Sequence, residues 1–231
     1  MKYTKKKFLF CGKKNDKHSK NIISFLRKKN IKLNVILTGE KLNQKNVSRL
    51  IYKREYDYMF FFRSKIILKL NKLRKNCLAI NFHPGPPEYR GIGCVNFAIL
   101  NKEKYYGATA HLMSNKIDNG PILLADYFKI SKDDNISSIL NKTYKIQLNQ
   151  IKKITELLIE KKNKKININS LKKNKFKWSK KIYLRKNLQK LYNLSNNIKK
   201  YDLDLLLKST MTKKFKPYYK NKKYNLKISD I

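Results

Sequence analysis

The chain has 231 residues, of which 41% are hydrophobic, and it carries a formal net charge of +41. This length and apolar content allow one α/β domain with a small appendage, and they exclude a disordered basic tail. No apolar run approaches the roughly 20 residues of a membrane-spanning helix, so no membrane partner is expected.

The three cysteines of the chain are unclustered. Cys11, Cys77 and Cys94 have no CxxC spacing, and an odd number does not make a disulfide framework. We therefore expect reduced thiols in a cytoplasmic protein, and no metal site. The apolar stretch near the N-terminus is only about four residues long, which is too short for the core of a signal peptide.

The positive charge allows two interpretations. It could serve a polyanion such as tRNA, since basic surfaces bind nucleic acids. However, the excess is mostly Lys, spread along a chain that is also rich in Asn and Ile, as is usual for genomes rich in A and T. The last 71 residues carry +20 and the first 160 carry +21. We favour a solvated, Lys-rich surface over a nucleic-acid site.

The first part of the chain alternates between strand and helix patterns. Apolar runs over 7–11 and 33–37 predict strands, and the apolar spacing over 19–29 predicts an amphipathic helix capped by Ser19. Strand, helix and strand within about thirty residues form a βαβ unit, which implies a parallel sheet. The turn after the first strand lacks G-x-G-x-x-G, so a dinucleotide site is not predicted.

Similar patterns continue to residue 162. The predicted elements are a strand over 56–62, a helix over 65–73 capped by Ser64, a strand over 77–82, a helix over 95–100, strands over 107–113 and 122–130, and a long helix over 135–162. Together they predict an α/β, Rossmann-like fold, in which a mostly parallel open sheet is flanked by helices.

The composition changes after residue 162. The remainder is rich in Lys and Asn with scattered aromatic residues, and it predicts one helix over 184–194 and a terminal hairpin over 215–228. We therefore divide the chain into a main domain, 1–162, and a small, basic, aromatic C-terminal subdomain, 163–231.

Three polar residues stand where a sheet edge would place them together. Asn81 and His83 end the strand over 77–82 and point to the same side of it, and Asp118 lies in a turn between two predicted strands. This set suits acyl transfer to an amine: the Asn amide can stabilise an oxyanion, and the His and Asp can move a proton. The alternative is structural, with Asn81 and Asp118 as loop formers and His83 packed on proline.

Four spaced motifs resemble the 10-formyltetrahydrofolate-dependent formyltransferase family, over roughly residues 55–130. The motifs are Asn81-x-His83-Pro84, Tyr89-Arg90-Gly91, Gly107-Ala-Thr109 and Asp118-x-Gly120-Pro-Ile122. The family includes glycinamide ribonucleotide, methionyl-tRNA and sugar-amine formyltransferases. The resemblance implies that Asn81, His83 and Asp118 form the catalytic trio and that residues 1–162 are the catalytic domain.

The resemblance also implies binding sites for both reactants, and no metal. The formyl donor would be 10-formyltetrahydrofolate, which we expect at Phe62, Arg63, Ser64 and Gly120. The residues expected on the acceptor side are Pro86, Tyr89, Arg90 and Gly91. Arg90 either binds a phosphate group of the acceptor or forms an ion pair with Glu88, and the sequence does not choose between these two roles. His111 alternates with apolar neighbours and is predicted to be a packed core residue.

The acceptor loop departs from the family pattern. Relatives usually run His-x-Ser-Leu-Leu-Pro-x-Tyr/Trp-Arg-Gly, whereas residues 83–91 are one residue shorter and lack Leu-Leu. The tail is too short for the β-barrel domain of methionyl-tRNA enzymes, and Trp178 with Ser179 resembles the tail of sugar enzymes. We therefore expect a nucleotide-linked amino sugar as the small-molecule acceptor, with methionyl-tRNA (disfavoured) and glycinamide ribonucleotide as alternatives, and a homodimer as a further expectation.

A non-enzymatic function remains a distant alternative. A basic RNA-binding module would place its aromatic and Lys side chains on one exposed face, and its affinity would fall steeply with salt. An enzyme would instead bring Asn81, His83 and Asp118 together at one site.

Overall fold

The computed structural model of the chain describes residues 5–39, 43–160, 175–194, 200–212, 215–219 and 222–223. Within these ranges no helix combines the length and the apolar character that crossing a membrane requires.

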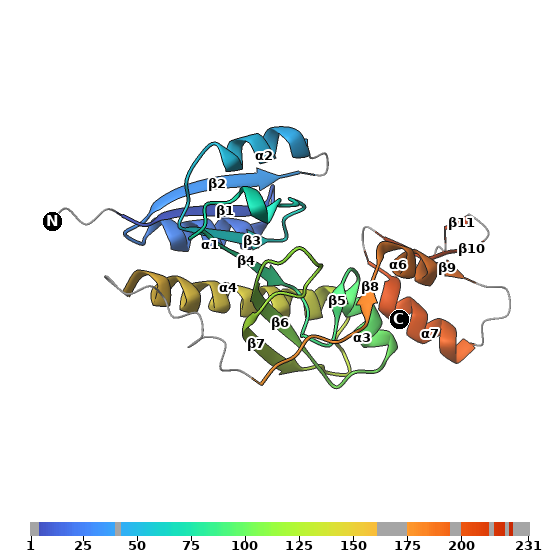
Figure 1. The fold of residues 1–231 in the computed structure, drawn as a ribbon. Helices are drawn as coiled ribbons and strands as arrows, with labels where there is room; N and C mark the ends of the chain where they lie inside the picture. The colour runs from blue at the N-terminus through green and yellow to red at the C-terminus, as the bar shows by residue number, and fades with distance from the viewer. Residues whose placement is uncertain are drawn as a thin grey trace.

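The main domain is built on one six-stranded sheet with the order β2-β1-β3-β4-β6-β7 (Figure 1). Its strands are β1 (Lys7–Lys13), β2 (Lys32–Thr38), β3 (Tyr58–Phe62), β4 (Leu78–His83), β6 (Tyr105–Leu112) and β7 (Ile122–Lys129). The first four are parallel, and β6 and β7 are antiparallel additions to one side. This confirms the predicted α/β fold with a mostly parallel open sheet.

Helices cover both faces of the parallel strands. Side chains alternate between the two faces along each strand, and here both sets are apolar, so each face needs a covering layer. Phe8, Phe10, Phe60 and Phe62 point to one face and pack with apolar side chains of α1 (Lys17–Arg27) and α4 (Ile136–Glu160). The side chains between them point to the other face, where Ile51 of α2 (Gln44–Tyr52) covers Leu9, Met59 and Phe61. Burial of each of these large side chains stabilises the fold by about 1.5–3 kcal/mol.

A third apolar cluster joins the main domain to the described residues from 175 onward, which we call the C-terminal segment. It gathers around α3 (Cys94–Leu100) and the first turns of α4, and it includes Tyr183 of β8 (Ile182–Tyr183). Strand β8 pairs in parallel with the short β5 (Arg90–Gly91), in the loop that follows β4. The C-terminal segment is thereby tied to the loop that begins with His83.

The rest of the C-terminal segment consists of short helices and two-residue strands. They are α6 (Arg185–Tyr192), β9 (Asn193–Leu194), α7 (Lys200–Thr210), β10 (Tyr218–Tyr219) and β11 (Lys222–Lys223). The pairing of β10 with β11 is antiparallel, as the hairpin prediction required, and its continuation over 224–228 lies outside the described residues. Residues 161–174 also lie outside them, so the domain boundary after residue 162 stays a prediction.

Two predicted helix features are wrong. The cap of α1 is Asp16, whose Oδ2 accepts a hydrogen bond of 2.8 Å from the backbone of Ser19, so Ser19 lies in the first turn and is not the cap. The helix predicted over 65–73 is absent except for the 3-10 turn η1 (Leu70–Lys72). Arg63 has a left-handed φ of 52°, and Ile66 is buried while Ile67 is 75% exposed, which suits an extended chain.

Two helices were missed. Helix α2 follows the cap Asn43 and buries only Ile51, and α7 lies in the Lys-rich tail. Both have apolar residues at the helical spacing i, i+3 and i+4, namely Val47, Leu50 and Ile51 in α2 and Leu203, Leu206 and Leu207 in α7, so the sequence held a signal for them.

Candidate active site

Asn81, His83 and Asp118 meet at the carboxyl end of β4. The Nδ2 atom of Asn81 lies 3.4 Å from Oδ1 of Asp118, and Nδ1 of His83 lies 3.3 Å from Oδ2 of the same carboxylate. Asp118 reaches this place from the turn between β6 and β7, more than thirty residues away in sequence. The three residues that the sequence singled out are therefore in contact, and their catalytic roles stay a prediction.

The turn that carries Asp118 is shaped by two backbone features. Asp118 has φ of 39°, in the left-handed region that few residues other than glycine adopt. A Cβ atom at Gly120 would lie 1.8 Å from the Leu112 carbonyl oxygen, so only glycine fits there. The turn can thus fold back tightly on β6, the neighbour of β4, and present its carboxylate to Asn81 and His83.

The Asp118 carboxylate is held by the loop after β4. The backbone N–H of Gly91 donates a 2.9 Å hydrogen bond to Oδ2. Burial alone would raise the pKa of Asp118, but the interactions with His83, His111 and the Gly91 N–H outweigh it and lower the pKa well below its usual value. The group is therefore a carboxylate at neutral pH, ready to stabilise positive charge on a neighbour.

His83 is 3% exposed and has an oxygen beside each ring nitrogen. Its Nε2 is 2.7 Å from the Tyr89 carbonyl oxygen, so Nε2 carries a proton and donates it there, and Nδ1 faces Asp118. Burial lowers the pKa of His83, against the opposite effect of Asp118. The imidazole is neutral at rest, and a proton arriving at Nδ1 would be stabilised by the carboxylate.

His111 is a member of this cluster as well as a core residue. It is 2% exposed, as predicted, but its Nε2 also lies 3.1 Å from Nδ2 of Asn81 and 3.4 Å from Oδ1 of Asp118. Its Nδ1 donates to the Leu112 carbonyl at 2.8 Å, so Nε2 is free to accept from the Asn81 amide. His111 therefore orients Asn81, a role that the antiparallel pairing of residues 81 and 111 creates.

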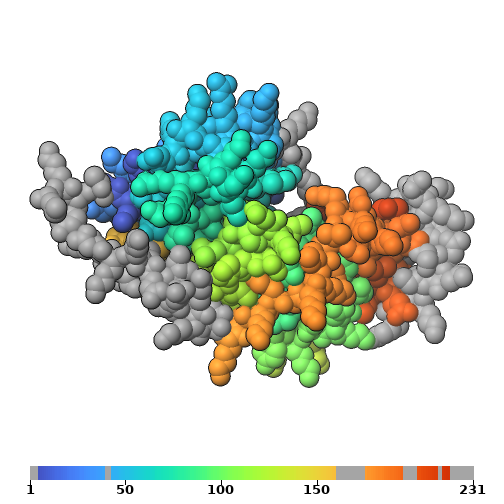
Figure 2. Space-filling view, viewed as in Figure 1, coloured from blue at the N-terminus to red at the C-terminus, as the bar shows by residue number. Residues whose placement is uncertain are grey.

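Trp178 lies across the cluster from the C-terminal segment. Its Nε1 donates a 2.7 Å hydrogen bond to the Gly120 carbonyl, and its ring stands edge-on to His111 and His83 with centroid distances of 5.0 and 6.0 Å. Figure 2 shows residues 175–194, in orange, lying against the green surface of the main domain. Only the resemblance of the tail to sugar enzymes had pointed to this residue.

The residues predicted on the acceptor side make hydrogen bonds and packing contacts within the protein. Arg90 is 5% exposed and donates to three backbone carbonyls, those of Ile117, Asp118 and Ser179, at 2.7–2.8 Å. Glu88 instead accepts from the Tyr127 hydroxyl at 3.0 Å, so neither a phosphate contact nor an Arg90–Glu88 pair fits this geometry.

The other acceptor-side residues are also packed. Tyr89 is 4% exposed, stacks on Tyr183 and donates its hydroxyl to Glu103 at 2.7 Å. Pro86 is buried, and its carbonyl accepts from the Tyr89 N–H at 2.9 Å. Gly91 has φ of 95° and lies so close to Tyr183 that no side chain would fit. These residues shape the loop, and their contact with an acceptor is untested.

The predicted donor-side residues line the carboxyl end of β3. Phe62 is fully buried in the core, and Arg63 pairs with Asp16 at 2.6 Å and lies 4.2 Å over the ring of Tyr144. Ser64 accepts from the Ile66 N–H at 3.2 Å through its hydroxyl. Their use in binding a donor stays a prediction. Among the described residues no three His, Cys, Asp or Glu side chains are grouped as metal ligands.

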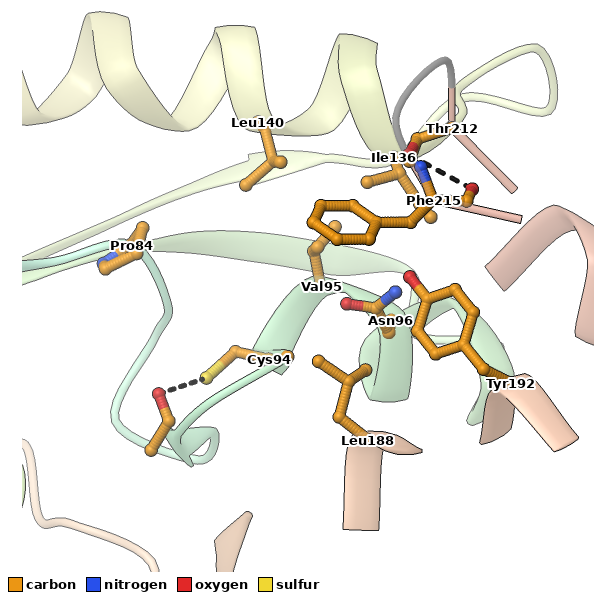
Figure 3. Close-up of a pocket in the computed structure, with 12 residues that line it drawn as sticks. Pro84, Cys94, Val95, Asn96, Ile136, Leu140, Leu188, Tyr192, Thr212 and Phe215 are labelled. Atoms are coloured by element: carbon orange, nitrogen blue, oxygen red, sulfur yellow. Dashed lines mark hydrogen bonds between the residues drawn. The ribbon is translucent and has the colours of Figure 1, made fainter. Parts of the chain in front are cut away.

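An apolar pocket of about 270 Å³ adjoins the cluster (Figure 3). Cys94 lines it, and the Cys94 sulfur lies 3.7 Å from Nε2 of His83. Tyr192 and Phe215 of the C-terminal segment line it as well. Burial raises the pKa of the Cys94 thiol far above its usual value, which favours the protonated thiol at neutral pH.

Comparison with known sequences gives relatives of two kinds. The bifunctional polymyxin resistance protein ArnA of Wigglesworthia glossinidia brevipalpis is 33% identical over 137 residues, which are 55% of this chain and 20% of the relative. The methionyl-tRNA formyltransferase of Clostridium tetani is 41% identical over 64 residues, 27% of this chain and 21% of the relative. The chain thus spans about a fifth of the length of these relatives.

Solved structures share the fold over nearly the whole chain. A sugar N-formyltransferase from a Shewanella species has a TM-score of 0.70 at 20% identity, and a 4-N formyltransferase from Francisella tularensis 0.69 at 21%, each over 92% of both chains. An N-formyltransferase from Helicobacter canadensis, in complex with folinic acid and dTDP-3-aminofucose, has 0.66 at 18%, over 88% of this chain and 80% of the other.

A family model places the chain among these proteins. The model described as formyl transferase matches residues 6–155, which include the whole sheet, the long helix α4 almost to its end, and the cluster of Asn81, His83 and Asp118. The chain therefore belongs to the formyl transferase family.

Proposed function

We propose that this protein transfers the formyl group of 10-formyltetrahydrofolate to the primary amine of a nucleotide-linked amino sugar. The observation that carries the proposal is the convergence of Asn81, His83 and Asp118 in a chain of the formyl transferase family. The donor and the acceptor are inferred from the complex of the Helicobacter canadensis neighbour with folinic acid and an amino-sugar nucleotide.

The chemistry begins with attack of the neutral amine on the formyl carbon, which forms a C–N bond and a tetrahedral oxyanion. Asn81 is the candidate donor to this oxyanion. One of its amide hydrogens is used by His111 at 3.1 Å, whereas the contact with Asp118 is long, at 3.4 Å, and can be exchanged for the oxyanion.

The proton of the attacking amine must leave, and N10 of the folate must gain one as its bond to the formyl carbon breaks. Asp118 and His83 can perform both steps, because Nδ1 of His83 and Oδ2 of Asp118 are 3.3 Å apart and share one proton readily. The products are the formamide and tetrahydrofolate, so atoms and charge balance without a metal or a redox partner.

The protein also supplies a dry environment for the transfer. His83 is 3% exposed and Trp178 lies on it, so bulk water is kept away from an acyl group that water could hydrolyse. Low water access also strengthens the interaction of the oxyanion with its donors.

Methionyl-tRNA is the second candidate acceptor, because the Clostridium tetani relative and several others are methionyl-tRNA formyltransferases. The net charge of +41 is compatible with tRNA. A non-catalytic RNA-binding module would place its aromatic side chains on an exposed face. Here Trp178 and Tyr183 instead face the main domain, where Trp178 contacts His83 and His111 and Tyr183 contacts Tyr89.

The test offers purified protein 10-formyltetrahydrofolate with three acceptors in parallel: amino-sugar nucleotides, glycinamide ribonucleotide and methionyl-tRNA. Mass spectrometry of each acceptor then measures the gain of a formyl group. Formylation of an amino-sugar nucleotide alone is expected. Formylation of only methionyl-tRNA or glycinamide ribonucleotide would contradict the acceptor, and no formylation of any would contradict the activity.

A further inference from the structure

A strongly basic cavity of about 870 Å³ opens at the carboxyl ends of β1, β2 and β3. Five cationic side chains line it, and no carboxylate is among its described lining residues. They are Lys13, Lys14, Arg63, Lys65 and Arg185. Lys13 ends β1, Lys14, Arg63 and Lys65 lie in the loops after β1 and β3, and Arg185 begins α6 in the C-terminal segment. In Figure 1 the arrow of β2 points toward the side of the molecule where α6 lies.

The arginines of this cavity are not explained by the composition of the chain. The sequence has 49 Lys and only 7 Arg, and two of those seven line this one cavity. A bias toward A and T supplies lysines, not arginines. The planar guanidinium binds phosphate oxygens through two parallel hydrogen bonds, which an ammonium group cannot do. The cavity therefore has the side chains that phosphate groups require.

Arg63 is fixed in place before any ligand arrives. Its Nη1 is paired with Asp16 at 2.6 Å, and the guanidinium carbon lies 4.2 Å from the ring centroid of Tyr144. Asp16 is itself held as the cap of α1. A guanidinium held in this way loses little conformational entropy on binding an anion, which favours affinity.

The cavity lies at a suitable distance from the catalytic cluster for a sugar nucleotide. Phe62 pairs with Phe82 across β3 and β4, so Arg63 follows at the level of His83, and β1 is one strand further. Adjacent strands are about 4.8 Å apart, so the ends of β3 and β1 lie about 5 and 10 Å from the end of β4. A sugar ring and its bond to a phosphate cover about that distance.

An aromatic side chain lies between the two cavities. Phe215 lines both the basic cavity and the apolar pocket next to Cys94, and in Figure 3 its ring points into the latter. The ring is 57% exposed and could stack on a base. The C-terminal segment thus contributes one cation and one aromatic ring to the space beside the site.

We infer that this cavity binds the diphosphate of a nucleotide-linked acceptor, and that Arg185 of the C-terminal segment completes it together with Arg63. This inference rests on the proposed function for the identity of the acceptor. It gives the C-terminal segment a role in holding the nucleotide, separate from the contact of Trp178 with the catalytic cluster. The competing anion is the glutamate of the folate, which carries two carboxylates.

The test measures binding by calorimetry, with thymidine diphosphate, uridine diphosphate and folinic acid as probes and without turnover. The variant R185Q removes one of the five positive charges of the cavity, and K186Q removes a positive charge from the next residue of α6, which is not among the cavity's described lining residues. We expect R185Q to weaken binding of at least one diphosphate about tenfold and K186Q to leave it within about twofold, as for a lost charge-assisted contact. R63K, which keeps the charge, is expected to weaken it as well.

Circular dichroism and thermal unfolding establish that each variant is folded. Three results of the binding measurements would overturn the inference: no binding of either diphosphate to the unchanged protein, equal effects of R185Q and K186Q, or an effect of R185Q on folinic acid alone. Failure of the proposed function looks different, since the diphosphate would bind while no amino-sugar nucleotide is formylated. Conversely, formylation with an unchanged KM in R185Q would refute the inference and leave the function intact.

Discussion

Replacing Asp118 by Asn tests the site most directly, because it removes a negative charge and keeps the shape of the side chain. The carboxylate accepts a 2.9 Å hydrogen bond from Gly91 and lies 3.3 Å from His83 and 3.4 Å from Asn81. An amide can still accept from Gly91 on one side. It cannot stabilise a proton on His83, so the proton transfer loses its electrostatic support.

The expected magnitudes separate catalysis from stability. A hydrogen bond to an ionised acceptor contributes about 1.5–3 kcal/mol and one to a neutral acceptor about 0.5–1.5 kcal/mol, so the weakened Gly91 contact costs about 1 kcal/mol of unfolding free energy. Loss of a positioned proton-transfer group lowers turnover by about two to four orders of magnitude. D118N should therefore be folded and nearly inactive.

The assay pairs kcat/KM for formyl transfer with urea unfolding, and it includes D133N as a control. Asp133 is exposed in the loop before α4, so D133N removes the same charge away from the site. We expect D133N to match the unchanged protein in both measurements. A D118N variant that keeps more than about a tenth of the activity would refute the role of Asp118 in proton transfer.

Three further predictions concern the same cluster. H83A should lower turnover by about two to four orders of magnitude and leave the protein folded; near-normal turnover would contradict the assignment of His83. W178F should keep the ring contacts but lose the 2.7 Å hydrogen bond to the Gly120 carbonyl, and the misplaced turn should lower the rate of formyl transfer by about tenfold to a hundredfold. Trp178 is the one tryptophan of the chain, so the fluorescence of the unchanged protein should change when folinic acid binds. A constant signal at saturation would argue against a donor site near Trp178. Stability should fall as the pH drops. The pKa of His83 in the folded protein is below its ordinary value of 6.5, so below that pH the unfolded chain binds a proton that the folded protein does not, and the lowered pKa of Asp118 adds to the loss below about pH 4. Urea unfolding at several pH values measures this decline, and H83A should flatten its upper part.

The sheet could be predicted from sequence because its strands are short, apolar and separated by polar turns. Residues 58–62 are buried without exception, as both faces of a central parallel strand should be. The helix predicted over 65–73 failed because an apolar run in a loop has no period that distinguishes it from a helix. There, Ile66 packs inward and Ile67 points to solvent, so neighbouring apolar residues serve different purposes.

The candidate catalytic cluster was predictable in part. Asn81 and His83 share one side of one strand, and the motif around Asp118 supplied the third residue. His111 was placed in the core correctly, but its contact with Asn81 depends on the register of two antiparallel strands, which the sequence does not state. Arg90 was expected to meet a ligand because a charged residue in a loop suggests one, whereas its guanidinium donates to the backbone carbonyls of Ile117, Asp118 and Ser179.

That use of Arg90 has a consequence for how the protein can be divided. Its guanidinium joins the backbone of the turn that carries Asp118 to Ser179, so one side chain connects this turn with the C-terminal segment. Removing that segment would take away Trp178, which donates to the Gly120 carbonyl, and the Ser179 carbonyl that accepts from Arg90. The family model matches residues 6–155, which do not include Ser179 or Trp178. We therefore expect that exchanging C-terminal segments between relatives disturbs formyl transfer before it changes the choice of acceptor.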